Sequence, residues 1–133
     1  MLLSNANKNK EGFMKIGISS EGKTILDFTD PRFGRCEYFQ VYDTDTQKLD
    51  VIINKGKEAS GGAGIVASNQ LVDENVDIII TGNLGPNAFE IINKSGIKAY
   101  SCEKISVSQA IEKFKNNELK LIDMSGPSHQ GIK

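Results

Sequence analysis

The feature that most constrains the fold is a short, almost wholly apolar run in the second half of the chain, Asp77-Ile78-Ile79-Ile80-Thr81. A strand of this kind is buried on both faces, which is typical of a parallel sheet covered by helices. A glycine-rich segment follows it directly, Gly82-Asn83-Leu84-Gly85-Pro86, and leads into a helical pattern. The run therefore predicts a strand–loop–helix unit inside an α/β domain.

Helical patterns and strands alternate around this run. One helix opens within residues 60–64, a second ends at Gly96, and a strand follows at Ile97–Tyr100. The last helix begins at Ser106, which has capping-box spacing to Gln109. Its apolar residues recur at helical intervals, at Val107, Ala110, Ile111 and Phe114.

The first half of the chain reads as strands. Alternating apolar residues begin at Met14, a polar loop covers residues 20–35, and two further strands are expected at Cys36–Asp43 and at residues 49–53. We expect the strands at Cys36–Asp43 and at residues 49–53 to pair as an antiparallel hairpin. The predicted order is β-β-β-α-β-α-β-α, with a short extended segment at Leu119–Met124, which gives an α/β fold with a mixed sheet and flanking helices.

Length and composition indicate one domain. The 133 residues are 38% hydrophobic, enough for a core, and we expect a single domain at residues 14–124 between flexible tails at 1–13 and 125–133. No apolar run approaches the roughly 20 residues that span a bilayer, and no signal peptide is evident, so we expect a cytoplasmic protein without a membrane partner. The net charge of −1 and the scattered basic residues argue against nucleic acid.

Two glycine-rich loops are the candidate site. Their candidate residues are Gly61, Gly62, Gly64, Gly82, Asn83 and Gly85. Glycine lets backbone N–H groups approach a ligand, and the helix N-terminus that follows adds partial positive charge. The loop after residue 81 is expected beyond the C-terminal end of a parallel strand, where α/β sheets bind ligands. The alternative is that the glycines only make tight turns; neither loop has a nucleotide-binding fingerprint.

Four sequence blocks together resemble a known family. The first is Asp30-Pro31-Arg32-Phe33-Gly34-Arg35-Cys36-Glu37-Tyr38-Phe39, in which a Phe-Gly-Arg turn precedes a strand with aromatic residues. The others are residues 61–64, 76–85 and 95–100. In this order they are similar to the blocks of the dinitrogenase iron–molybdenum cofactor-binding family, which includes NifX-like and NafY-like proteins and the C-terminal part of NifB. The resemblance runs from about Met14 to Leu121.

The resemblance implies a ribonuclease H-like fold and a non-catalytic role. It implies binding or carrying of an iron–molybdenum or other molybdenum, iron or copper–sulfur cluster, in cofactor biosynthesis or metal homeostasis, with cluster-assembly proteins as partners. The alternative is a metal-free regulatory or interaction module of the same fold, which binds a protein or a small anion.

Arg32, Gly34, Arg35 and Cys36 complete the candidate cofactor-binding set. An anionic cluster suits cationic side chains and N–H donors, although either arginine could instead be solvated or paired with a carboxylate. Cys36 and Cys102 are the candidate metal ligands as thiolates; Cys36 could instead be a small buried residue, and Cys102 a bystander. Neither has a Cys-x-x-Cys partner.

An enzyme is not expected. Asp27, Asp30 and Asp43 are available for a divalent metal, but their neighbours form no motif that would bring them together. The single histidine, His129, lies in the predicted tail, where a hydrolytic triad would lack a rigid scaffold.

Overall fold

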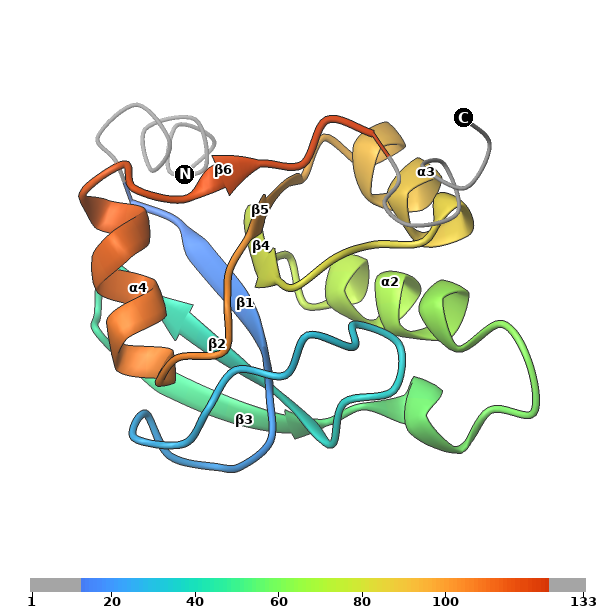
Figure 1. Cartoon of the computed structure of the whole chain (residues 1–133), viewed down its shortest axis with the longest axis horizontal. Helices are drawn as coiled ribbons and strands as arrows, with labels where there is room; N and C mark the ends of the chain where they lie inside the picture. Colours follow the sequence, from blue (N-terminus) through green and yellow to red (C-terminus); the bar gives the residue numbers. More distant parts are fainter. Residues whose placement is uncertain (1–12, 125–133) are drawn as a thin grey trace, which may run out of the picture.

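The computed structural model describes residues 13–124, which form a six-stranded mixed sheet flanked by helices (Figure 1). The strands lie in the order β3-β2-β1-β4-β5-β6. Their bounds are β1 (Lys15–Ser20), β2 (Tyr38–Asp43), β3 (Leu49–Ile53), β4 (Ile78–Thr81), β5 (Lys98–Ser101) and β6 (Lys120–Leu121). The helices are α2 (Ala63–Asp73), α3 (Pro86–Lys94) and α4 (Val107–Lys115), with a short 3₁₀ helix, η1 (Lys55–Glu58).

The centre of the sheet is parallel. Strand β4 pairs in parallel with β1 and with β5, and all four of its residues are buried. Strands β2 and β3 form the predicted antiparallel hairpin beside β1, and β6 pairs antiparallel with β5. The C-terminal ends of β1, β4 and β5 therefore meet at one edge of the sheet.

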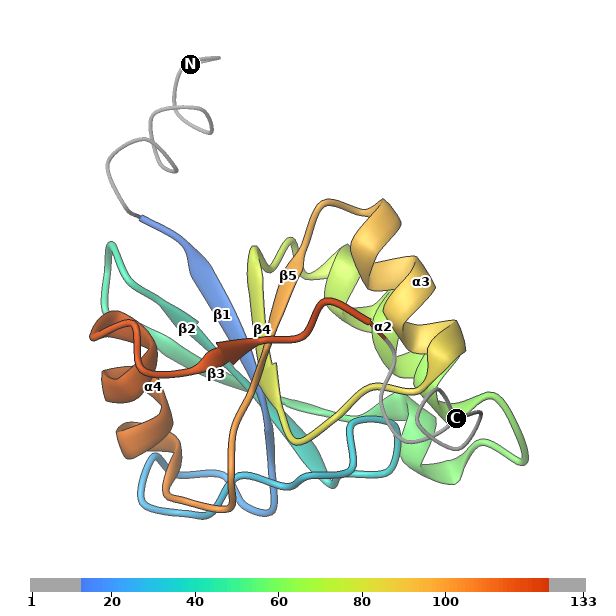
Figure 2. The same cartoon turned by 45° about the horizontal axis from the view of Figure 1, so that its top comes forward.

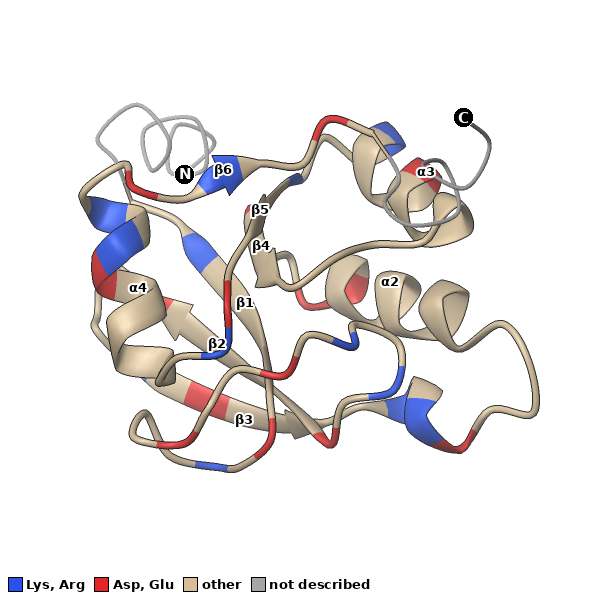
Figure 3. Cartoon of the chain, viewed as in Figure 1, with Lys and Arg blue, Asp and Glu red and all other residues tan. Residues whose placement is uncertain are grey.

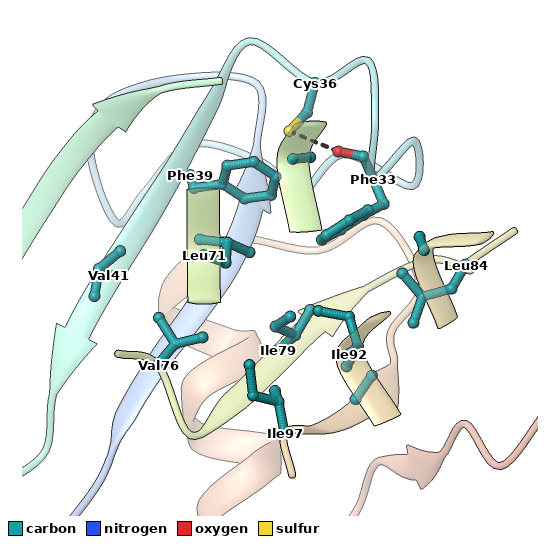
Figure 4. Packing of buried hydrophobic residues seen from close by; sticks show 13 residues of the cluster. Phe33, Cys36, Phe39, Val41, Leu71, Val76, Ile79, Leu84, Ile92 and Ile97 are labelled. Carbon is teal, nitrogen blue, oxygen red and sulfur yellow. Dashed lines mark hydrogen bonds between the residues drawn. The ribbon is translucent and has the colours of Figure 1, made fainter. Parts of the chain in front are cut away.

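Two hydrophobic clusters lie on opposite faces of the sheet, because successive side chains of a strand point to opposite sides. Helices α2 and α3 cover one face, with Leu71 and Ile92 packed against Ile79 and Phe39 (Figures 2 and 4). Helix α4 covers the other face, where Ile111 belongs to the second cluster. None of the helices in residues 13–124 is long and apolar enough to cross a membrane.

The predicted mixed α/β architecture is confirmed, and each predicted helix and strand is present. Strand β6 falls within the extended segment expected at Leu119–Met124. Helix η1 was not expected, since Lys55–Glu58 has no apolar period; the Asn54 side chain caps it by accepting from the Gly56 N–H. Residues 1–12 and 125–133, where the tails were predicted, lie outside the described residues.

One strand boundary differs from the prediction. Strand β2 begins at Tyr38 rather than at Cys36. The carbonyl of Cys36 accepts a hydrogen bond from the Asn54 side chain at 2.9 Å, and its thiol lies within hydrogen-bond distance of the carbonyls of Phe33 and Tyr38. Cys36 is therefore part of the turn before the strand.

Candidate functional site

Three segments enclose a hollow at the C-terminal edge of the parallel strands. Its volume is about 370 Å³. It is lined by the turn at residues 32–35, the start of α2 at residues 62–65, and residues Asn83 and 85–88, which lead from β4 into α3. Both helices run back along the sheet to the next parallel strand, so both begin at this edge. The turn and both glycine-rich loops, separate in sequence, therefore meet at one place.

Two helix N-termini open into this hollow. The first intrahelical bonds run from Val66 to Gly62 in α2 and from Phe89 to Gly85 in α3. The N–H groups of the first helical turn before those residues have no partner within the helix. Neither N-cap is a side chain that accepts a hydrogen bond, and neither first turn carries an acidic residue. The partial positive charge of both helices is thus directed at the hollow.

A close backbone contact explains one glycine in the wall, and a left-handed conformation explains another. A Cβ on Gly34 would lie 2.8 Å from the Gly64 nitrogen, so only glycine lets the turn touch the start of α2. Gly62, the N-cap of α2, has a φ of 69°, in the left-handed region that favours glycine. Gly34 therefore sets how closely the turn approaches α2, and Gly62 lets the chain enter the helix.

Arg32 is held by a neighbouring carboxylate. Its Nε and Nη2 donate to the two carboxylate oxygens of Asp30 at 3.0 and 2.9 Å, and its backbone N–H donates to the same group. Burial by itself would raise the pKa of Asp30, but the hydrogen bonds from Arg32 outweigh it and lower that pKa. Hydrogen bonding to Asp30 in turn raises the pKa of Arg32. The carboxylate-paired alternative for Arg32 is the one observed, although this residue also lines the hollow.

Arg35 is bound to backbone rather than to a carboxylate. Its Nη1 donates to the carbonyls of Lys57 at 2.9 Å and Ala59 at 2.8 Å. Among the described residues no carboxylate forms an ion pair with it, so its charge is not neutralised locally. No Asp or Glu is among the residues of the described segment 13–124 that line the hollow. The charged residues elsewhere are spread over many elements (Figure 3).

Sequence comparison identifies the family. The family described as "Dinitrogenase iron-molybdenum cofactor" matches residues 14–117. The chain belongs to this family. The match spans the turn at residues 32–35, both glycine-rich loops and every helix of the domain.

Known structures resemble this family member along most of its length. The apo form of the orange protein from Desulfovibrio gigas is 30% identical, with a TM-score of 0.82 over 86% of this chain and 97% of that one. A putative NifB protein from Thermotoga is 32% identical, with a TM-score of 0.76 over the same shares. An uncharacterized protein of Methanocaldococcus jannaschii is 25% identical, covering 84% of this chain and 93% of the relative.

The two cysteines of this family member lie in different places. Cys36 belongs to the cluster under α2 and α3, Cys102 to the cluster under α4, and neither lines the hollow (Figure 4). Cys36 is fully buried, and burial raises the pKa of its thiol to about 12. Burial also raises the pKa of Cys102, whose thiol donates to the Glu103 carbonyl. The structure therefore does not bring the two predicted metal ligands together, and it favours the buried, protonated alternative for Cys36.

The carboxylates considered for an enzyme are also separate. Asp27 accepts from Thr24, Asp30 from Arg32, and Asp43 from the turn residues Asp45 and Thr46. Within residues 13–124 no group of three or more His, Cys, Asp or Glu side chains is arranged to hold a metal ion. His129 lies outside the described residues.

The wall of the hollow differs in detail from the predicted set. Gly61 and Gly82 do not line it, whereas Phe33, Ala63, Ile65, Pro86, Asn87 and Ala88 do. Gly82 instead allows a backbone contact, since a Cβ there would lie 2.6 Å from the Cα of Pro31. Most of the additional residues are neighbours of predicted ones, so widening each glycine loop by a few residues into its helix would have found them.

Proposed function

We propose that this chain is a non-catalytic binding or carrier protein for an iron–molybdenum or related metal–sulfur cluster. The observation that carries the proposal is the meeting of two uncapped helix N-termini in one hollow, whose wall has no acidic side chain among the described residues. Sulfide clusters of this class are anionic, and backbone N–H groups and helix N-termini stabilise anions. We also propose that this fold is ribonuclease H-like, as the resemblance to the family implies.

Family membership supports this role. The family is named for the iron–molybdenum cofactor, which associates the chain with cofactor binding or carriage during cofactor assembly. One similar structure is of a protein called putative NifB. A carrier needs a site that accepts its cargo and releases it, and contacts from N–H groups and Arg35 meet that need without covalent ligation.

The donor set of the hollow indicates what form the cargo takes. Among the described residues, its wall offers N–H groups, two arginines and the amides of Asn83 and Asn87, but no thiol, imidazole or carboxylate. Bare iron or copper ions are held in proteins by thiolate, imidazole or carboxylate side chains. We therefore propose that the chain takes a preassembled cluster, whose metals already carry their sulfides.

Uptake of tetrathiomolybdate, a stable anionic sulfide of molybdenum, tests the proposal. The purified protein is incubated anaerobically with this anion and, in parallel, with ferrous ion alone, then passed through a desalting column. We expect the sulfide complex to be retained, with its charge-transfer absorption shifted, and the bare ion to be lost. Retention of neither would overturn the carrier role and would favour the metal-free module, for which binding of a protein or small anion is the expected activity.

A further inference from the structure

The backbone of the wall is packed so closely against η1, behind it, that no side chain fits between them. A Cβ on Gly56 would lie 2.4 Å from the Ala63 carbonyl oxygen and 3.0 Å from that of Gly34. The turn at residues 33–36, helix η1 and the start of α2 therefore touch through their main chains. Polar main-chain groups buried in such a contact need partners supplied from behind it.

Asn54 supplies these partners with one buried side chain. It is only 1% exposed. Its Nδ2 donates to the carbonyls of Gly34 at 3.0 Å and Cys36 at 2.9 Å, and its Oδ1 accepts from the Gly56 N–H at 2.8 Å. Both amide hydrogens and the amide oxygen are thus used, and the bonds join the turn to η1.

These bonds also determine which end of each peptide dipole faces the hollow. Gly34 lines the hollow but Asn54 does not, so the Gly34 carbonyl is turned toward a residue behind the wall. Across a trans peptide bond the next N–H, that of Arg35, points the opposite way. Arg35 holds the carbonyls of Lys57 and Ala59, which do not line the hollow either.

We propose that Asn54 is a positioning residue that sets the polarity of the hollow. By holding the carbonyl oxygens of Gly34 and Cys36 behind the wall, it leaves the positive ends of the turn's dipoles available to an anion. The inference rests on the proposed function, namely that the hollow receives an anionic sulfide cluster. It assigns Asn54 no contact with that cluster.

The chain offers a matched control in Gln40, a second fully buried amide. The two hydrogens of its Nε2 are shared among three acceptors, the Ser20 hydroxyl and the carbonyls of Gly22 and Thr24. It therefore also fixes a loop from a buried position, although its Oε1 has no partner among the described residues. It is not among the residues that line the hollow. Replacing either amide removes buried hydrogen bonds that hold a loop, and only the bonds of Asn54 adjoin the site.

The experiment compares Asn54→Ala and Gln40→Ala with the wild type in anaerobic titrations with tetrathiomolybdate, at a temperature where circular dichroism shows all three folded. We expect both variants to melt at lower temperature, but only Asn54→Ala to bind the anion at least ten-fold more weakly. The amide resonances of residues 34–36 should shift in free Asn54→Ala and stay in place in Gln40→Ala. Asn54→Asp, of nearly the same shape but with an acceptor in place of the donor, should bind no better than Asn54→Ala.

The outcomes separate the two proposals. Equal affinities of wild type and Asn54→Ala, or an equal loss in Gln40→Ala, would overturn the positioning role while leaving the proposed function standing. Unchanged resonances of residues 34–36 in Asn54→Ala would also overturn it. Failure of the wild type to bind the anion would overturn both.

Discussion

Arg32 and Asp30 form a two-pronged ion pair in which the carboxylate is buried and the guanidinium largely exposed, with side-chain exposures of 1% and 65%. The pair lies where the polar loop after β1 leads into the turn at residues 32–35, which lines the hollow. Asp30 also accepts from the Arg32 backbone, so it shapes the turn as well as pairing with the charge. The neutral pair leaves Arg35 as the cation of the wall that no described carboxylate neutralises.

Asp30→Asn should lower the free energy of unfolding by about 1.5–3 kcal/mol at pH 7, the range for hydrogen bonds to charged groups. Because the folded pKa of Asp30 is lowered, its stabilising effect is complete above the unfolded pKa of about 3.9 and is lost as the pH falls through the folded value. Urea unfolding at pH 7 and near pH 3 checks this, and the deficit of the variant should shrink at the lower pH. The control is Asp45→Asn, at an exposed turn position. An Asp30→Asn deficit in unfolding free energy that was equal at the two pH values would contradict the prediction.

Gly82→Ala should destabilise the protein by roughly 1–3 kcal/mol, as expected for overpacking. The added Cβ would meet the Cα and Cβ of Pro31 at 2.6 Å, where Arg32 and Asn83 form a parallel bridge. Gly61→Ala, in the other glycine-rich loop, has no atom within 4 Å of the new Cβ and should leave the melting temperature nearly unchanged. Thermal unfolding of both variants tests this prediction. Equal decreases in melting temperature would show that the Pro31 contact is not what requires Gly82.

The Cys36 thiol should be inert in the folded protein. It is fully buried, and its pKa is raised to about 12, so almost no thiolate is present at neutral pH. In a Cys102→Ala variant Cys36 is the sole thiol, since the chain has 2 cysteines. Ellman's reagent should release colour from this variant only after denaturation. Rapid reaction of the native variant, prevented by tetrathiomolybdate, would restore Cys36 as a candidate ligand.

Asn87→Asp should change stability and binding in opposite directions. Asn87 is exposed in the first turn of α3 and lines the hollow. A carboxylate there should stabilise the helix by about 0.3–1 kcal/mol through its dipole, yet repel an anion that enters the hollow. We expect a higher melting temperature and several-fold weaker binding of tetrathiomolybdate. The control is Asn93→Asp, near the end of the same helix, which should not raise the melting temperature and should leave the affinity for tetrathiomolybdate unchanged. Equal losses of affinity in the two variants would contradict the prediction.

The parts of the fold that local sequence determines were predictable. The apolar run at residues 77–81 identified the buried central strand, and the capping box at Ser106 located the start of α4. Helix η1 was not predictable, because its stability comes from the Asn54 cap and from contact with the start of α2 rather than from its own residues.

The candidate site was predictable only in its outline. Glycine-rich loops before helices indicated where N–H groups would converge. The partners of the charged groups depend on distance along the chain: Asp30 is a near neighbour of Arg32, whereas the carbonyls that bind Arg35 are 22 and 24 residues away. The role of Asn54 had no sequence signal, because nothing marks an isolated asparagine after a strand as a buried connector.

The most direct test of the central proposal is an anaerobic titration of ¹⁵N-labelled protein with tetrathiomolybdate, followed through the backbone amide resonances. We expect the largest shifts on the N–H groups that face the hollow, those of Arg35, Ala63, Gly64, Asn87 and Ala88. Binding that left these resonances in place and shifted others, such as those around Cys102, would contradict the proposal, as would the absence of any shift.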